Sequence, residues 1–540
     1  MPYAGTYRRA RTIGKLWTAL RTAWLWVWDR LDPAGAVLEN PGHRRGPRLL
    51  QLIRMSSARA RRELLRLAPR WERRISVPGD RPGLRLWDAI GIPRSSEGLH
   101  LLLLGATGSG KTQILRPLIE QILSDREGHV LIIDRKGDFT SWLAGRHDVA
   151  ILAPWDQRTI PWDVALEVAG ALDAAALAER FVPLDAHATD PYWVNTPRTV
   201  IRAAVGVLQA LHAGRPGTGR GWGWKDLAEA LGQERAQLAA WLAQTDEGER
   251  AARPLLGTER VSAQDVYDSL GMWTRRLTHI AAGWPQRGGL SLRAWTQGRQ
   301  GPRVLLVPTM VPDEELAALI VRLIVETVAS ELLVLPDSAT RRVWLVLDEF
   351  NLTRLDTLTR LLPLARSKGT VILAALQDVA RTRALYGPDL ASSILNAFAT
   401  RIALRVADPD TQEWAAKALG QHDVERRRQV RSRHRGASPS ETIAEQVVDR
   451  TEYLALPDEL GELPPLTGFL DVPQWPVLYL QWPYEPIPQT VPPWVPASWV
   501  SAPPALRSRS QSGPEMGLDT RRPSTQLVLK PPGRHMRRGG

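Results

Sequence analysis

Eight consecutive residues, 105–112, have the types and spacing of a phosphate-binding loop. They read GATGSGKT and fit the pattern G-x-x-x-x-G-K-[ST]. The glycines let the backbone curl so that successive N–H groups face a phosphate, and the following helix adds positive potential. Lys111 would neutralise the β- and γ-phosphates, and the Thr112 hydroxyl would bind Mg²⁺. We therefore expect ATP and Mg²⁺ at Gly105, Ala106, Thr107, Gly108, Ser109, Gly110, Lys111 and Thr112.

A second group with catalytic potential follows the apolar run at 343–347, which ends in Asp348 and Glu349. A strand with this ending brings both carboxylates to the carboxyl edge of a sheet, where such folds bind ligands. Asp348 would hold Mg²⁺ through water, and Glu349 would act as a general base toward the attacking water. Acidic strand ends are common, so this interpretation depends on the nearby phosphate loop.

Two further polar residues are candidates for the same chemistry. Gln377 follows the apolar run at 371–376, where its amide could contact the γ-phosphate or the attacking water. Arg366 lies between the segment after Glu349 and that run, and could reach a nucleotide bound to a neighbouring subunit. The alternative for Gln377 is an ordinary polar strand end. For Arg366 it is a solvated cation at a helix end.

The surrounding pattern predicts an α/β fold of the RecA-like type with a mostly parallel sheet. Apolar runs at 101–104, 130–133, 150–152, 304–307, 343–347, 371–376 and 401–406 alternate with helical segments. Residues 164–295 lack strand patterns and are rich in Ala, Leu, Glu and Arg, which predicts an all-α insertion. The ATPase domain would then comprise 81–163 and 296–483. Residues 424–442, rich in Arg, Ser, Gly and Pro, are expected to form a mobile loop.

The two ends of the 540-residue chain are basic. Net charge is +13, of which residues 1–75 carry +12 and residues 507–540 carry +6, so the body is mildly acidic. Basic ends suit a polyanion, either nucleic acid or an anionic membrane. The alternative is a solvated, arginine-rich surface. The absence of cysteine excludes disulfides and thiolate-bound zinc or iron–sulfur sites.

The N-terminal region, 1–80, is expected to be helical, and the Pro/Arg-rich tail, 484–540, to be disordered. Between residues 13 and 28, Trp and aliphatic residues recur at helical spacing opposite basic ones. The face with the Trp and aliphatic residues suits a membrane interface. The alternative is that this face packs on protein. No run reaches the roughly 20 apolar residues of a transmembrane helix. We therefore expect a cytoplasmic protein, with peripheral contact at the inner face of the cell membrane as an option.

Several blocks occur in an order typical of one protein family. The blocks are GATGSGKT, IIDRKGDF (132–139), APWDQRTIPWD (153–163), DPYW (190–193), LVLDEF (345–350), LARSKGTVILAALQD (364–378) and ILNAFATRIALR (394–405). On these blocks the chain resembles the TraD/TraG-type coupling proteins of conjugative type IV secretion systems, relatives of the FtsK and HerA motors. The resemblance covers about residues 90–410.

The resemblance implies a homo-hexameric ring that moves single- or double-stranded DNA through its pore by hydrolysing ATP. Relaxase and components of the secretion system are the implied partners. It also implies that 164–295 is the family's all-α domain, and that Arg366 and Gln377 stand where the family carries a trans-acting arginine and a polar sensor.

One departure from the family pattern leaves alternatives open. Family members usually begin with two membrane helices, and no such segments are expected here. A HerA/FtsK-like DNA pump in repair or segregation is therefore an alternative. A nucleotide-gated docking platform with little turnover is another, although Lys111, Asp348 and Glu349 argue for an active enzyme.

Overall fold

The computed structural model describes residues 52–54 and 81–501, apart from gaps at 89, 126, 184–189, 213–220, 258–261, 286 and 435–439. For residues 52–54, 422–434 and 440–450 only the backbone is described. The expected amphipathic helix at 13–28 and the basic tail at 507–540 lie outside these residues. Among the helices that are described, none combines the length and apolarity needed to cross a membrane.

A ten-stranded sheet forms the centre of the described chain, in the order β1-β14-β13-β10-β4-β9-β8-β5-β7-β6. The seven strands from β10 to β6 are parallel. They are β4 (Leu101–Leu104), β5 (His129–Asp134), β6 (Val149–Ile151), β7 (Val304–Pro308), β8 (Val343–Leu347), β9 (Thr370–Leu376) and β10 (Thr400–Ala403). The predicted α/β fold with a mostly parallel sheet is confirmed.

The other end of the sheet is mixed. Strand β13 (Thr467–Asp471) is antiparallel to both β10 and β14 (Val477–Gln481), and β1 (Leu52–Arg54) pairs in parallel with β14. A separate hairpin joins β2 (Pro82–Trp87) and β3 (Ile90–Pro93). The short helix α3 (Arg94–Glu97) then leads into β4.

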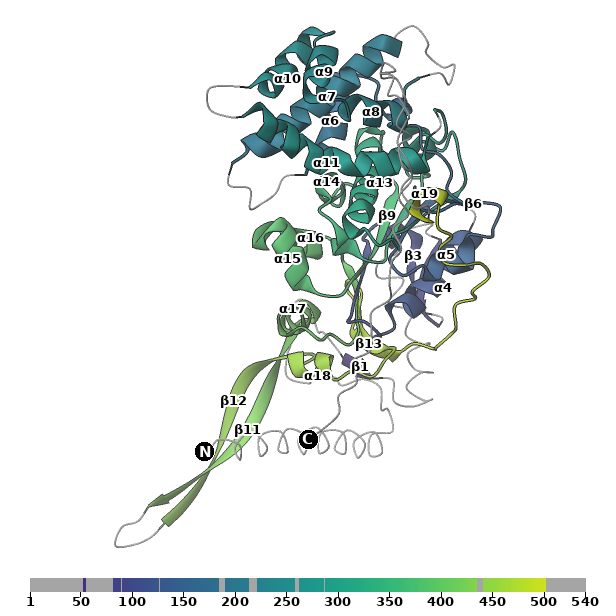
Figure 1. Ribbon diagram of the computed structural model, residues 1–540. Helices are drawn as coiled ribbons and strands as arrows, with labels where there is room; N and C mark the ends of the chain where they lie inside the picture. Colours follow the sequence, from purple (N-terminus) through teal and green to yellow (C-terminus); the bar gives the residue numbers. More distant parts are fainter. Residues whose placement is uncertain are drawn as a thin grey trace, which may run out of the picture. The chain divides into compact units, whose positions relative to one another are not determined.

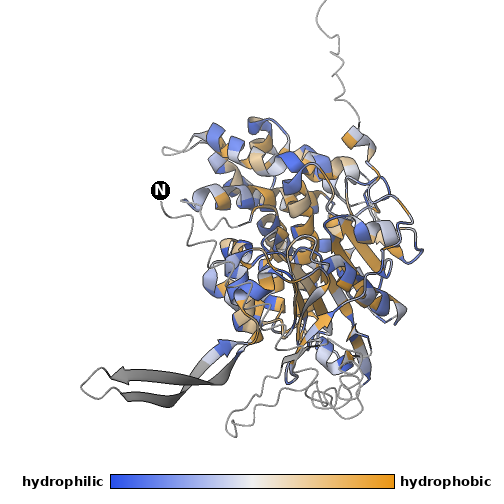
Figure 2. Cartoon of the chain, turned by 90° about the horizontal axis from the view of Figure 1, so that it is seen from below, coloured by the Kyte–Doolittle hydropathy of each residue, from blue (hydrophilic) through white to orange (hydrophobic). Residues whose placement is uncertain are grey.

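The inner strands are buried along their whole length, which explains their continuous apolar runs. Every residue of β4, β7, β8 and β9 is buried, because helices cover both faces of a parallel sheet. Figure 2 shows apolar strands inside and helices of mixed hydropathy around them. Among these helices are α4 (Lys111–Ser124), α5 (Asp138–Leu143), α13 (Glu314–Val334) and α14 (Asp356–Leu361).

The described elements between β6 and β7 are all helical. They form a 3₁₀ turn (Val164–Glu167), α6 (Ala171–Phe181), α7 (Tyr192–His212), α8 (Trp224–Leu231), α9 (Arg235–Leu242), α10 (Asp246–Leu256), α11 (Ala263–Gly283) and α12 (Leu292–Thr296). Figure 1 shows α6 to α11 clustered beside α13 and α14. The described residues up to Ser501 belong to one compact unit, and within it α6 contacts α13, so this helical part packs on the sheet domain.

Partly buried polar contacts connect the helical part to α13. Arg180 on α6 donates to Thr327 Oγ1 at 3.0 Å and to Ser330 Oγ at 2.7 Å. Arg322 donates to the Arg180 carbonyl at 3.2 Å and to Thr353 Oγ1 at 2.9 Å. Burial lowers the pKa of Arg322 to about 10, which still leaves it charged near neutral pH. Because Thr353 lies four residues after Glu349, these bonds link α6 through Arg322 to the segment that follows this carboxylate.

Helices α15 (Val379–Tyr386) and α16 (Pro388–Asn396) lie between β9 and β10 in the chain. After β10 come α17 (Pro409–Leu419), a long hairpin and α18 (Pro457–Gly461). The expectation of a mobile loop at 424–442 is wrong for most of that segment. Strands β11 (Gln421–His434) and β12 (Ser440–Tyr453) pair antiparallel in unbroken register from Gln421 opposite Tyr453 to His434 opposite Ser440. Figure 1 shows this two-stranded ribbon extending from α17.

The predicted start of the disordered tail, residue 484, is too early. Residues 484–501 run along α4, α5 and the loop after β6, and end in the short helix α19 (Ser498–Ser501). Thr490 N donates to the Ser141 carbonyl at 2.9 Å, and Ala497 N donates to the Trp155 carbonyl at 2.9 Å. We call residues 484–501 the C-terminal strap.

Candidate functional site

The loop at 105–110 connects β4 to α4 with the geometry that its sequence predicts. Gly108 and Gly110 have φ angles of 76° and 109°, which side chains rarely tolerate. A Cβ on Gly110 would also overlap the Leu466 side chain. Helix α4 begins at Lys111, so its free N–H groups face the concave side of the loop. The residues at 105–112 therefore form a cradle for phosphate.

Lys111 places a cation inside this loop. Its Nζ donates to the Gly105 carbonyl at 2.5 Å and to the Ala106 carbonyl at 3.3 Å. Burial lowers the pKa of the ammonium, whereas the nearby carboxylates of Glu349 and Asp348 raise it. The carboxylates thus help to keep Lys111 charged although it is largely out of water.

Asp348 and Glu349 follow β8, next to the loop. The Asp348 backbone N–H donates to the Ile133 carbonyl at 3.1 Å, which extends the pairing of β8 with β5. Burial raises the pKa of Asp348 to about 6, against the opposing effect of Lys111. Burial also raises the pKa of Glu349, which Lys111 and a hydrogen bond from Gln377 lower. A carboxylate whose pKa lies above its ordinary value is a stronger base, which suits Glu349 to accept a proton.

Gln377 connects the phosphate loop to this pair of carboxylates. Its Nε2 donates to Glu349 Oε2 at 2.7 Å, and its Oε1 accepts from Thr107 Oγ1 at 3.1 Å. The side chain thus spans from β9 to its two neighbours in the sheet, β8 and β4. A shift of the loop around bound phosphate would therefore change the position of Glu349.

Residues of the phosphate loop and the polar residues that follow β8 and β9 line one cavity of about 300 Å³. Lys111, Thr112, Asp348, Glu349 and Gln377 all contribute to it, together with Ala106, Gly108 and Gly110 of the loop, so eight of the predicted residues meet at one place. These side chains fit a nucleotide bound with Mg²⁺. The Thr112 hydroxyl and the Asp348 carboxylate are suitable ligands for Mg²⁺, which usually takes its other ligands from water and phosphate oxygens. No group of three or more His, Cys, Asp or Glu in the described chain could hold a metal by itself.

The cavity also contains residues to which the sequence analysis gave no role. Arg135 and Lys136 follow β5 and lie at its edge with Asp138, and Pro465, Leu466 and Tyr484 form another side. The position of β5 beside β8 could have indicated Arg135 and Lys136, because parallel strands end at one edge of a sheet. Arg405, which is outside the cavity lining, contacts the loop through its backbone: its carbonyl accepts from the Ala106 N–H at 2.7 Å.

Arg366 lies elsewhere. It precedes β9, and its side chain packs on Gly98, so that a Cβ on Gly98 would be 2.8 Å from Arg366 Cγ. Gly98 itself precedes β4, so both residues lie at the amino edge of the sheet, away from the phosphate loop. Arg366 is exposed, and it has no ion-pair partner within the part of the chain that the structure describes. Its role is therefore not within this chain's own cavity.

Comparison with known proteins places this arrangement in a family. Residues 86–483 match the family model described as the type IV secretion-system coupling protein DNA-binding domain. The coupling protein TraD of Escherichia coli (strain K12) is 23% identical over 430 residues, which are 78% of this chain. The chain spans 58% of the length of TraD.

Solved structures show the same fold. The unbound monoclinic form of the bacterial conjugative coupling protein TrwB superposes with a TM-score of 0.65 at 24% identity, covering 79% of this chain and 94% of that one. TrwB in complex with ADP and Mg²⁺ gives a TM-score of 0.64 at 24% identity and covers 79% and 95%. The model match includes the phosphate loop, both carboxylates and the helical insertion. This chain therefore belongs to the family of type IV secretion-system coupling proteins.

Proposed function

We propose that this protein is an ATP-driven DNA translocase that delivers DNA to a type IV secretion apparatus in conjugation. The observation that carries the proposal is the meeting of Lys111, Thr112, Asp348, Glu349 and Gln377 in one cavity. This set contains a cation for phosphate, two ligands for Mg²⁺, a general base and a group that connects them. Family membership supports DNA as the substrate that is moved.

The contacts in the cavity support a role for each residue. Lys111 would neutralise the β- and γ-phosphates of ATP, and Thr112 and Asp348 would hold Mg²⁺. When bound, Mg²⁺ supplies positive charge to the phosphate oxygens as the terminal bond breaks. Glu349 orients the attacking water and accepts its proton. Gln377 holds Glu349 and contacts Thr107, so it responds when the phosphate is released. TrwB has been solved with ADP and Mg²⁺ and with a non-hydrolysable ATP analogue, which supports these ligands.

The proposal includes assembly and partners. A homo-hexameric ring would surround the DNA, with relaxase and secretion components as further partners. The helical part that contains α6 to α11 would be the all-α domain of the ring. A nucleotide-gated docking platform is the competing hypothesis. Measuring ATP hydrolysis with and without DNA separates them: a motor hydrolyses ATP faster on DNA, and a platform shows little turnover in either case.

The basic tail is expected to contribute non-specific affinity for DNA. Phosphate contacts release counterions, so affinity falls with salt in proportion to the number of contacts. Deleting residues 507–540 removes a net charge of +6. The slope of log K against log[salt] should then become shallower by up to about 5. The measurement is fluorescence anisotropy with labelled DNA across a range of salt.

A tail of unchanged length, with its eight Lys and Arg residues replaced by Gln, is the matched control for chain length. It should reproduce the shallow slope of the deletion. A slope that stays at the full-length value in both variants would assign the tail to a partner other than DNA.

The amphipathic segment at 13–28 is proposed to bind the surface of an anionic membrane. The full-length chain should then float with liposomes that contain anionic lipid, and a variant lacking residues 1–28 should not. Flotation of both variants to the same extent, or of neither, would favour packing of the segment on protein.

A further inference from the structure

One side of the nucleotide cavity has no part in the phosphate chemistry. It is formed by Pro465, Leu466 and Tyr484, which come from the chain on either side of β13 and β14. Leu466 among them lies against Ser109 and Gly110 of the phosphate loop. The surface of the three residues is aromatic and aliphatic, in contrast to the charged groups on the other sides of the cavity.

Leu466 is held in an unusual backbone conformation at this place. Its φ is 59°, which is uncommon for a leucine. Its N–H donates to the Ser109 carbonyl at 2.9 Å, and its carbonyl accepts from the Trp482 N–H at 2.7 Å. The side chain lies against Gly110. Backbone conformations of this kind persist where the surroundings fix them, and they are frequent at ligand sites.

Tyr484 is fixed by anchors on both sides although its own ring is exposed. The Trp482 indole is buried and donates to the Leu86 carbonyl at 3.0 Å. On the other side, the Glu485 N–H donates to Gln113 Oε1 at 3.2 Å, and Arg116 pairs with the Glu485 carboxylate at 3.0 Å. Because Gln113 directly follows Thr112, these bonds place Tyr484 beside the start of α4. The Tyr484 residue is 69% exposed.

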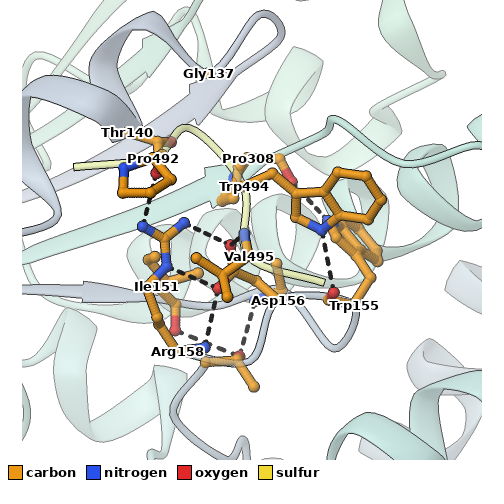
Figure 3. A network of polar contacts seen from close by, with 12 residues as sticks. Gly137, Thr140, Ile151, Trp155, Asp156, Arg158, Pro308, Pro492, Trp494 and Val495 are labelled. Atoms are coloured by element: carbon orange, nitrogen blue, oxygen red, sulfur yellow. Dashed lines mark hydrogen bonds and ion pairs between the residues drawn. The ribbon is translucent and has the colours of Figure 1, made fainter. Parts of the chain in front are cut away.

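The rest of the C-terminal strap prevents this segment from moving away. Arg158 donates to the Pro492 carbonyl at 2.8 Å and pairs with the buried Asp156 at 2.7 Å. The Trp494 indole donates to the Trp155 carbonyl at 3.2 Å. Figure 3 shows Trp155, Asp156 and Arg158, which come from the loop after β6, beside Pro492, Trp494 and Val495 of the strap. The backbone on both sides of Tyr484 is therefore held in place before any ligand arrives, which lowers the entropy cost of binding.

We propose that Tyr484 and Leu466 form the binding site for the purine base of the nucleotide. The inference rests on the proposed function, since it takes the adjacent loop to hold the phosphates. An exposed tyrosine ring stacks on the face of a base, and the leucine supplies an aliphatic contact. Stacking uses the face that all purines share. The site therefore binds adenine and guanine nucleotides with similar affinity and selects nucleotides over bare polyphosphate.

Isothermal titration calorimetry of the full chain with Mg²⁺ tests the site with three ligands. They are a non-hydrolysable ATP analogue, the corresponding GTP analogue, and inorganic tripolyphosphate, which lacks a base. Tyr484→Ala should weaken binding of both nucleotide analogues by roughly 5- to 150-fold, the effect of removing one aromatic stacking partner. Binding of tripolyphosphate should stay unchanged, because Lys111 and the loop remain.

Two further variants serve as controls. Tyr484→Phe keeps the ring and should bind both analogues like the wild type. Trp193→Ala removes another partly exposed aromatic residue, 37% exposed and outside the cavity, and should change no affinity. The inference is overturned if Tyr484→Ala binds the analogues as well as the wild type, or if it loses tripolyphosphate to the same degree. A wild-type protein that binds none of the three ligands would instead refute the proposed function, and the base site with it.

Discussion

Replacing Glu349 with glutamine is expected to leave a protein that binds ATP and barely hydrolyses it. The amide has the size of the carboxylate and can still pair with Gln377, but it cannot accept the proton of the attacking water. General-base catalysis contributes about 10²–10⁴-fold to rates, and turnover should fall by that factor. The measurement is steady-state phosphate release, combined with nucleotide affinity determined by calorimetry. A Glu349→Gln enzyme with the wild-type rate would mean that another residue is the base.

Lys111→Ala is the companion variant. Its comparison with Glu349→Gln separates the loss of ATP binding from the loss of ATP hydrolysis. It removes the charge that faces the phosphates and leaves Asp348 and Glu349 without their nearest cation. We expect loss of both ATP binding and turnover. Circular dichroism should show the same helix content in both variants. If Lys111→Ala bound ATP as tightly as Glu349→Gln, the loop would not be the phosphate site.

The central sheet and most of the cavity could be predicted because their determinants are local in sequence. Uninterrupted apolar runs mark strands buried on both faces, and the glycine pattern marks the loop between β4 and α4. The parallel arrangement then places the residues after each strand at one edge. Asp348, Glu349 and Gln377 follow directly from this rule, and Lys136 would have followed from its application to β5.

The strap and the hairpin could not be predicted from local composition. Residues 484–501 are rich in proline, which is typical of disorder, yet Trp494, Trp499 and Thr490 bond to residues more than 300 positions earlier. The sequences of strands β11 and β12 lack the alternation of polar and apolar residues that is typical of a strand with one buried face, so this pattern did not indicate them. Tyr484 was missed for the same reason: its place in the cavity depends on partners that are distant in sequence.

Arg366→Ala is expected to assemble and bind ATP but to turn over about 10³–10⁵-fold more slowly, if the arginine completes a neighbour's site. Strand β9 separates Arg366 from Gln377, and its seven residues span roughly 20 Å, so the guanidinium cannot serve its own cavity. In a ring of head-to-tail contacts, the amino edge of one subunit can face the nucleotide of the next. We propose this arrangement. The activity of the wild type should then rise faster than linearly with protein concentration until rings form.

The decisive measurement mixes Arg366→Ala with Lys111→Ala. Each variant alone has one defective component at every interface. In mixed rings, some interfaces pair an intact loop from one subunit with an intact arginine from its neighbour, so activity should partly return. Arg360→Ala, which removes another exposed arginine six residues earlier, is the matched control and should keep the wild-type rate. A mixture no more active than its separate components, although mixed rings are shown to form, would rule out the trans role and leave Arg366 as a surface residue packed on Gly98.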